Sequence, residues 1–225
     1  MTVTASGDGL RFSPARQEVP IGANLEREVS LAVSAAASRP GVYRWRLEVT
    51  DGAARTETPL TLVVLAAGES LAYEYDMDQD GFPDVVLEHS RLRAVFSPHR
   101  GGRALEFLLK GRRANAFAPH GTLDAGRPLE ARIVGPGRVE LAGDGLVRRI
   151  SLGAADDFLV VEQEGGAAEW QILSPLRGEP PEARLTILSP GGQVESLRQP
   201  FSTLYRIHFP AGAPRRAHFS LLGPR

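Results

Sequence analysis

Hydrophobic and polar residues alternate with a period of two along most of this chain. In the segment "GVYRWRLEVTDG" (residues 41–52), the apolar side chains at every second position from Tyr43 to Val49 share one face of an extended chain, and polar side chains take the other face. This period is typical of a β-strand with one buried face. The Asp51-Gly52 pair that follows predicts a tight turn.

The same alternation predicts strands over residues 27–35 and 58–66. Residues 25–37 have some helix propensity, but their valines and small residues favour a strand followed by a loop. Glycine and proline interrupt the pattern every 8 to 12 residues or so, which suits an antiparallel sandwich and not a βαβ fold. No segment forms a convincing amphipathic helix, so we expect an all-β fold.

Residues from about 67 onward also predict strands. The segment "VVLEHSRLRAVFSPHRGGRALEFLLKG" contains two or three strands, broken at Ser97-Pro98 and at Gly101-Gly102. Further strands are expected in "EARIV", "RVELA", "LVRRISL", "FLVVEQE", "EWQIL", "ARLTIL", "TLYRIHF" and "RAHFSLL". The strand "LTLVVL" is followed by the loop "AAGES", so we predict two β domains, residues 1–66 and 67–225, with a boundary between Ala66 and Ser70.

The first region resembles the small immunoglobulin-like accessory domains of bacterial exported enzymes and surface proteins. The residues that carry this resemblance are "SP" with "QEVPIGAN", then "PGVYRWRLEVTDG", then the final strand "LTLVVL". The resemblance implies an immunoglobulin-like β-sandwich over residues 1–66. It implies nothing specific about function, because such folds serve many functions.

The second region resembles the C-terminal β-sandwich of family 57 glycoside hydrolases and related glucanotransferases, which is a galactose-mutarotase-like supersandwich. The carrying pieces are "DMDQDG", "VLEHSRLRAVFSP" and the "GGR" turn. The resemblance implies a larger antiparallel β-sandwich, here shortened, and a carbohydrate-associated module. In those enzymes the catalytic carboxylates lie in a separate N-terminal barrel, and nothing in this sequence corresponds to that barrel.

Composition and charge narrow the classes of protein to consider. The 225 residues are 42% hydrophobic and 24% charged, which is ordinary for a globular protein, and the net charge of −1 argues against a nucleic-acid partner. The chain has no cysteine, which excludes disulfides and thiolate metal sites. No apolar run reaches the ~18 residues of a membrane span. Polar residues follow Met1, so we expect a piece of a longer exported protein, periplasmic, extracellular or at the cell surface, whose signal peptide is not in this sequence.

The segment "DMDQDGFPD" contains the strongest candidate for a metal site. Asp76, Asp78, Asp80 and Asp84 occupy positions one, three, five and nine, and Gly81 at six permits a sharp turn. Calcium prefers six to eight carboxylate and carbonyl oxygens, so we predict one structural calcium, held by the four aspartates and the Phe82 carbonyl. Position twelve is a leucine, so the loop is not an EF-hand and is nearer to the shorter "DxDxDGxxD" calcium loops. The alternative is a solvated acidic turn.

A mutarotase-type sugar enzyme would need histidines and a carboxylate around the sugar ring. His99 and His120 with Glu162 or Glu164 are the candidates, although histidines at surfaces or strand edges are more common in a chain of this size. No nucleophile or acid pair has a diagnostic spacing, and no GxSxG, P-loop or HExxH motif occurs. We therefore assign no catalytic residues and predict no hydrolase or epimerase activity from this chain alone.

Arginines and tryptophans offer further contacts of low specificity. The arginines around the "GGR" turn suit an anionic sugar or a neighbouring domain, or are simply solvated: they are Arg100, Arg103, Arg112 and Arg113. Trp45 lies on the apolar face of its strand, so it is expected in a core, and Trp170 suits either a core or a sugar ring.

The sequence thus favours a non-catalytic, carbohydrate-associated β module of an exported or cell-surface protein, with structural calcium and with carbohydrate or other envelope proteins as partners. Two alternatives stay open. One is a structural assembly or adhesion protein of the cell envelope, and the other is a mutarotase-type sugar enzyme.

Overall fold

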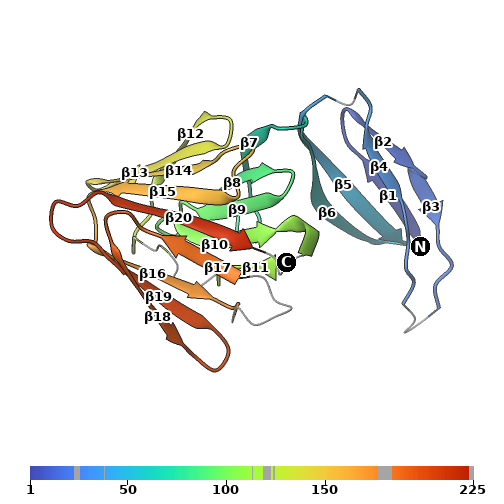
Figure 1. Ribbon diagram of the computed structural model, residues 1–225. Coiled ribbons are helices and arrows are strands. Elements are labelled where there is room, and N and C mark those ends of the chain that lie inside the picture. The colour runs from blue at the N-terminus through green and yellow to red at the C-terminus, as the bar shows by residue number, and fades with distance from the viewer. Residues whose placement is uncertain are drawn as a thin grey trace. The chain divides into compact units, whose positions relative to one another are not determined.

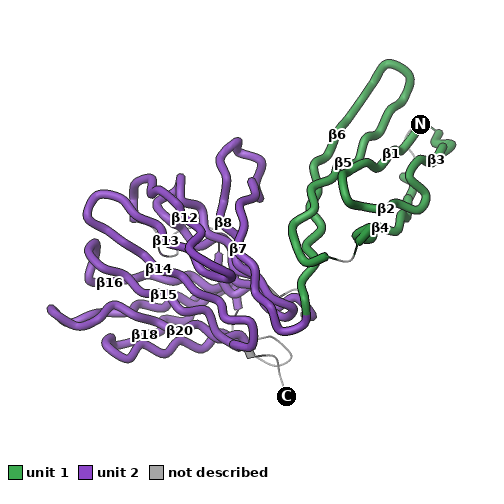
Figure 2. The backbone as a smooth tube through the Cα atoms, turned by 90° about the horizontal axis from the view of Figure 1, so that it is seen from above, with its two compact units in different colours: residues 1–66 green, residues 67–225 purple. Residues whose placement is uncertain are grey.

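The prediction of an all-β fold is confirmed. A computed structural model describes residues 1–22, 26–37, 39–112, 114–118, 123, 125–176 and 184–222. These residues form twenty β-strands and one three-residue 3-10 helix, Lys110–Arg112 (Figure 1). No helix in this part of the chain has the length and apolarity to cross a membrane. The chain divides into two compact units, residues 1–66 and 67–225 (Figure 2).

The first unit contains a four-stranded and a two-stranded sheet. The four-stranded sheet has the order β3-β1-β5-β6, with every pair antiparallel. Its strands are β1 (Thr2–Ser6), β3 (Arg16–Glu18), β5 (Gly41–Asp51) and β6 (Ala54–Val64). The two-stranded sheet pairs β2 (Leu10–Ser13) with β4 (Ala32–Ala35). The immunoglobulin-like identity of this unit stays a prediction.

The hairpin β5–β6 contains the two longest strands of the first unit. The two strands pair over eleven positions, from Gly41 with Val64 to Asp51 with Ala54, and Gly52 takes the left-handed backbone conformation in the turn. Trp45 packs against Phe12, with ring centroids 5.4 Å apart. The alternation along residues 41–52 therefore forms a strand whose apolar face contacts the second sheet of the unit.

The second unit is built from three antiparallel sheets. Their orders are β11-β10-β9-β8-β7, β12-β13-β14-β15-β20-β17 and β16-β19-β18. The five-stranded sheet contains β7 (Ser70–Tyr75), β8 (Asp84–His89), β9 (Leu92–Ser97), β10 (Arg103–Leu109) and β11 (Ala114–Asn115). The six-stranded sheet contains β12 (Glu130–Gly135), β13 (Arg138–Gly143), β14 (Leu146–Leu152), β15 (Phe158–Glu164), β17 (Arg184–Leu188) and β20 (Arg215–Leu222). The three-stranded sheet contains β16 (Glu169–Ser174), β18 (Gln193–Arg198) and β19 (Thr203–His208).

One hydrophobic core joins the three sheets of the second unit. Phe107 comes from the five-stranded sheet, Phe219 from the six-stranded sheet and Ile207 from the three-stranded sheet, and all three are fully buried. Phe117 lies between Phe107 and Phe219, with centroids 5.5 Å from each. This core fixes the sheets against one another and so positions the loops at their ends.

Three strands of the second unit, β7, β11 and β18, were not expected from the sequence, and one strand of the first unit is shorter than expected. Every residue of β18 is exposed and the strand lies at a sheet edge, so it has no buried face to impose a period of two on the sequence. The segment of β7 was interpreted as the start of the domain and not as a strand. The strand expected over residues 27–35 is reduced to Ala32–Ala35.

Candidate functional site

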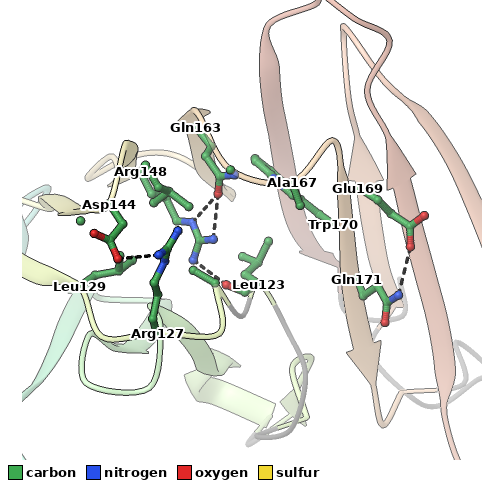
Figure 3. A pocket seen from close by; sticks show the side chains of 14 residues that line it. Leu123, Arg127, Leu129, Asp144, Arg148, Gln163, Ala167, Glu169, Trp170 and Gln171 are labelled. Atoms are coloured by element: carbon green, nitrogen blue, oxygen red, sulfur yellow. Dashed lines mark hydrogen bonds and ion pairs between the residues drawn. The ribbon is translucent and has the colours of Figure 1, made fainter.

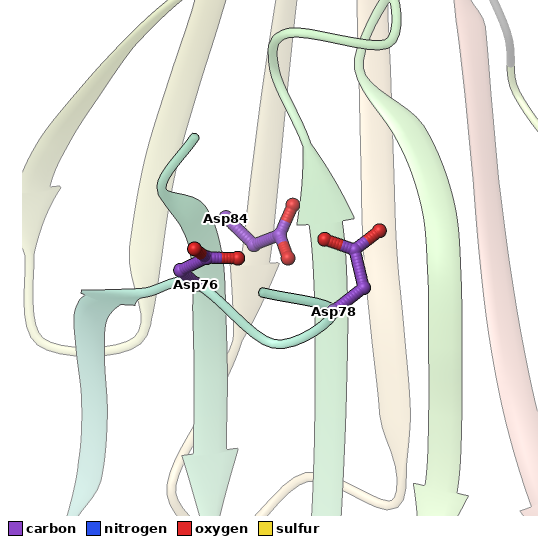
Figure 4. A group of neighbouring side chains, drawn as sticks. All are labelled: Asp76, Asp78 and Asp84. Carbon is purple, nitrogen blue, oxygen red and sulfur yellow. The ribbon is translucent and has the colours of Figure 1, made fainter. Parts of the chain in front are cut away.

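The acidic segment forms the loop between β7 and β8. Tyr75 pairs with Asp84 in the ladder, so residues 76–83 close a hairpin, and Gly81 takes a left-handed conformation within it. The carboxylates of Asp76, Asp78 and Asp84 turn toward one another (Figure 4), with one oxygen of each lying within 4.8 Å of the others.

Hydrogen bonds to backbone N–H groups shape this loop. Asp76 accepts from the Asp80 and Gly81 amides at 3.1 and 2.9 Å, and Asp84 accepts from the Met77 amide at 3.2 Å. Asp84 is only 1% exposed. Burial raises the pKa of Asp84, and the charges of Asp78 and Asp80 add to this effect, while the hydrogen bonds from Ser97 and Met77 oppose it. A buried carboxylate with acidic neighbours is stabilised by a nearby positive charge.

An arginine supplies part of that charge. Arg100, in the turn between β9 and β10, contacts the carboxylates of Asp78 at 2.8 Å and Asp80 at 2.7 Å. The Phe82 amide donates to Asp80 at 3.0 Å, and this bond, followed by those of Arg100, lowers the pKa of Asp80. Arg100 thus links Asp78, which is one of the three converging aspartates, to Asp80, which is not. The Phe82 ring stacks on His99, with centroids 3.6 Å apart, and the role of its carbonyl as a ligand stays a prediction.

The three converging aspartates fit a hard divalent cation. Calcium–oxygen distances of about 2.3–2.6 Å allow two ligand oxygens to lie up to about 5 Å apart, which accommodates the observed 4.8 Å. Their hydrogen bonds do not prevent this, since each carboxylate oxygen offers about two lone pairs. The described residues could thus hold a metal ion here, and the identity of the metal belongs to the proposal below.

The histidine and glutamate set of the mutarotase hypothesis is spread over different contacts. His99 stacks on Phe82, whereas Glu162 pairs with Arg216 at 3.2 Å and Glu164 pairs with Arg149 at 2.6 Å on β14. His120 lies outside the described residues, as does Arg113 of the arginine set. Arg103 begins β10, and Arg112 ends the 3-10 helix.

A pocket of about 460 Å³ in the second unit was not predicted from the sequence (Figure 3). Its volume lies within the range of roughly 300–1,000 Å³ that is typical of small-molecule sites. Three loop regions surround it: the segment before β12, the β13–β14 turn and the β15–β16 loop. The described lining residues are Leu123, Ala125, Arg127, Leu129, Gly143, Asp144, Leu146, Arg148, Gln163, Gly166, Ala167, Glu169, Trp170 and Gln171.

Arg148 organises one wall of the pocket. It is 2% exposed, and its guanidinium donates to the Gln163 side-chain oxygen at 2.8 and 3.0 Å and to the Gly102 and Leu123 carbonyls at 2.8 and 2.6 Å. Gly102 must be glycine here, because its backbone is left-handed and a Cβ would lie 3.0 Å from Arg148. Arg148 therefore holds two loops and β15 around the cavity.

Trp170 closes another side of the pocket. The indole is 3% exposed and packs edge-on against Phe209, with ring centroids 4.8 Å apart. Its Nε1–H has no hydrogen-bond partner among the described residues. Trp170 was expected either in a core or against a sugar ring. Its ring belongs to the core cluster and also lines the pocket.

The sequence contains a signal for this pocket, although it was overlooked. In β14 the buried face carries Leu146, Arg148, Ile150 and Leu152, so an arginine occupies a position that the alternation reserves for an apolar residue. Gln163 interrupts the buried face of β15 in the same way. A polar residue in register with an apolar face marks a buried polar contact, and two such residues on adjacent strands predict one shared site.

The comparisons with known proteins add little to this geometry. No protein-family model and no curated protein matches the chain. Among solved structures, the chain is similar to a 4-alpha-glucanotransferase from Thermococcus litoralis, with a TM-score of 0.41 and 11% sequence identity. The match covers 69% of this chain and 40% of that one. A glucanotransferase is among the enzymes that the second region was expected to resemble, but a similarity this distant carries no argument about function.

Proposed function

We propose that this chain is a non-catalytic, carbohydrate-associated β module of an exported or cell-surface protein. The observation that carries the proposal is the pocket of the second unit, which combines leucines and an indole with polar side chains. Its described lining has two cationic residues, Arg127 and Arg148, and two anionic residues, Asp144 and Glu169. Such a charge balance together with apolar walls suits a small uncharged polar ligand, and a sugar unit has that character.

The contacts of the charged residues favour binding over catalysis. Asp144 pairs with Arg127 at 2.7 Å, while Glu169 accepts from Gln171 at 3.0 Å and contacts His208 at 3.2 Å. Each carboxylate is thus held by a charged or polar neighbour, and Arg148 is committed to Gln163 and to backbone carbonyls. A general acid or base needs a side chain that is free to take up or release a proton, whereas Asp144, Glu169 and Arg148 each already have a charged or polar partner.

Titration of the purified chain with a set of neutral oligosaccharides, followed by calorimetry, tests this function. We expect saturable binding that is lost in Leu146→Arg, which fills the pocket with a long charged side chain. We also expect no anomerisation and no hydrolysis of the bound sugar. If no saccharide of the set binds, or if bound sugar turns over and a pocket variant abolishes the turnover, the proposal is wrong.

We further propose that Asp76, Asp78, Asp80 and Asp84, with the Phe82 carbonyl, hold one structural calcium. The ion would compensate the buried charge of Asp84 and fix the loop to β8, with Asp80 contributing after release from Arg100. Binding only to the folded chain stabilises it by about 2.7 kcal/mol at a hundredfold excess of calcium over the dissociation constant. Thermal unfolding with calcium or with a chelator measures this increment.

A matched pair of variants makes the calcium test specific. Asp78→Asn removes one of the converging carboxylates, whereas Asp157→Asn removes an aspartate that pairs with Arg91 at 2.5 Å outside the loop. The increment should vanish in Asp78→Asn and persist in Asp157→Asn. Equal melting temperatures in calcium and in chelator for the unmodified chain would show that the loop is only an acidic turn held by Arg100.

One observation favours the alternative of an assembly or adhesion protein. The three-stranded sheet ends at β18, an edge strand whose Leu197 is 58% exposed, and Phe201 just beyond it is 86% exposed. Exposed apolar residues beside a sheet edge are common in protein–protein contacts. Light scattering over a range of concentrations, with Leu197→Ser and Phe201→Ser as variants, distinguishes an assembling chain from a monomeric one.

A further inference from the structure

The mouth of the pocket carries an ion pair that a ligand can reach. Arg127 and Asp144 contact each other at 2.7 Å between Nη1 and Oδ2, and their side chains are 60% and 62% exposed. Arg127 comes from the segment before β12 and Asp144 from the β13–β14 turn, so the pair spans two of the loops that surround the cavity (Figure 3). The pocket is thus open on the side where this pair lies.

The local backbone fixes Asp144 in place. Asp144 and Gly145 have φ angles of 49° and 75°, which is the left-handed pair of a tight two-residue hairpin turn. Gly143 approaches Leu129 so closely that a Cβ there would lie 3.0 Å from the leucine side chain. The turn and the segment before β12 are therefore packed together, and the ion pair joins them at the rim.

The pair is chemically complementary to two adjacent hydroxyl groups. A carboxylate only accepts hydrogen bonds and a guanidinium only donates them, whereas a hydroxyl does both. One hydroxyl of a vicinal diol can donate to Asp144 while its neighbour accepts from Arg127. Leu129 and Leu146 line the same pocket and offer an apolar surface to the C–H groups of a ring. Since the rim pair has no net charge, it favours an uncharged ligand.

We propose that this pocket binds a neutral pyranose unit, with the Asp144 carboxylate and the Arg127 guanidinium recognising a vicinal diol. Asp144 is then a specificity-determining residue, because its charge accepts from hydroxyls and repels sugars that carry a carboxylate. Arg148 and Gln163 are positioning residues that hold the wall behind the ligand. This inference rests on the proposed carbohydrate-binding function and names its site and its class of ligand.

Variants that remove one charge of the rim at a time test the proposal. Asp144→Asn keeps the shape of the side chain and suits the left-handed turn, while removing the charge. Arg127→Gln removes the guanidinium, and Asp157→Asn is the control, an aspartate whose pair with Arg91 lies outside the pocket. The probes are neutral methyl hexopyranosides that differ in one hydroxyl, together with methyl α-D-glucopyranosiduronate. Saturation-transfer NMR and calorimetry measure binding to the full chain.

We expect at least one neutral pyranoside to bind, about tenfold more weakly to Asp144→Asn and to Arg127→Gln and unchanged to Asp157→Asn. The uronate should bind the unmodified chain more weakly than its neutral counterpart, and Asp144→Asn should narrow that gap. If Asp144 had a purely structural role, the Asp144→Asn variant would keep the same difference in affinity between the uronate and its neutral counterpart.

The results that would contradict this inference differ from those that would contradict the proposed carbohydrate-binding function. Neutral pyranosides that bind equally to the unmodified chain and to both rim variants would place the sugar elsewhere, which overturns the inference and leaves the function standing. A uronate that binds more tightly than its neutral counterpart would also overturn it. If no pyranoside or oligosaccharide binds the unmodified chain, the carbohydrate-binding function itself fails.

Discussion

The two compact units are both built from antiparallel hairpins, but they bury very different amounts of apolar side chain. In the described part of the first unit only three hydrophobic residues are buried, Val3, Ala5 and Val19. In the second unit a single core draws on all three sheets, and every residue of β8 is buried. The first unit thus relies mainly on its long hairpin, and the second on its interior.

The difference determines where a binding site can form. Burying polar groups costs free energy, so a unit needs a large apolar core before it can hold them inside. The second unit buries Asp84, Glu88, Arg148 and Gln163, and these residues shape the acidic loop and the pocket or lie in the same sheets. A unit of about 66 residues has little core to offset such costs. The candidate sites accordingly lie in the second unit.

The largest expected loss of stability comes from a substitution at the centre of the second unit's core, and it should affect that unit alone. Phe117→Ala removes a ring that contacts both Phe107 and Phe219, and it should lower the free energy of unfolding of the second unit by about 3–5 kcal/mol. The first unit should unfold as before. The chain has two tryptophans, Trp45 in the first unit and Trp170 in the second. In a Trp170→Phe background the fluorescence of Trp45 reports the first unit, and in a Trp45→Phe background that of Trp170 reports the second. A common transition for both reporters would contradict the separation.

A slightly smaller effect is expected at the buried arginine. Arg148→Met keeps a long side chain but leaves the Gly102 and Leu123 carbonyls and the Gln163 amide oxygen without this donor. Because an unsatisfied buried polar group costs about 1–3 kcal/mol, we expect a loss of about 2–4 kcal/mol in the second unit, measured by urea unfolding. In the double variant Arg148→Met/Gln163→Leu part of this loss should be recovered. A loss below about 0.5 kcal/mol would show that Arg148 does not organise the pocket.

The pH dependence of stability should differ between the units as well. All five histidines lie in the second unit, and burial lowers the pKa of His89, as do the charges of Lys110 and Arg91. In the unfolded chain His89 takes up a proton near pH 6.5, whereas in the folded unit it takes up this proton only at lower pH. Protonation therefore favours the unfolded chain, and stability falls as the pH drops below about 6.5. Between pH 7 and 5.5 we expect the free energy of unfolding of the second unit to fall, and to fall less in His89→Gln.

The first unit supplies the control for this titration. It contains no histidine, so its stability should stay flat over the same range. His218, whose pKa is also lowered by burial, contributes in the same direction, and the double variant with His218→Gln should flatten the profile of the second unit further. Equal slopes in the two units would contradict the assignment to buried histidines.

The sequence predicted what depends on a regular period and missed what depends on contacts between distant segments. Most strands of the second unit followed from alternation, because one face of each is buried in the core. The acidic loop was recognised in the sequence because its four aspartates stand close together in the chain. The contact of Arg100 with Asp78 and Asp80 joins residues about twenty positions apart, and no local pattern encodes it. The pocket forms where three loops meet, and its only signals in the sequence are two polar residues on apolar strand faces, Arg148 in β14 and Gln163 in β15.

The smallest expected effect comes from surface ion pairs, which should contribute similar amounts to the stability of both units. On the six-stranded sheet, oppositely charged residues stand in register across five strands: Arg132, Glu140, Arg149, Glu162 and Arg216. Glu140 contacts Arg132 at 2.9 Å and Arg149 at 3.2 Å. The first unit has a counterpart in Glu57, which contacts Arg46 at 3.3 Å and Arg55 at 3.1 Å.

Glu140→Gln and Glu57→Gln should therefore have similar consequences in their own units. Exposed ion pairs contribute about 0.2–1 kcal/mol, and salt screens them, so each variant should lose about 0.5 kcal/mol in dilute buffer and almost nothing at 1 M salt. Chemical unfolding by urea, which does not add charge, measures both with the two tryptophan reporters. If Glu140→Gln cost as much as Arg148→Met, the row of surface charges would stabilise the second unit as much as its interior does, and the contrast with a unit that relies on its hairpin would fail.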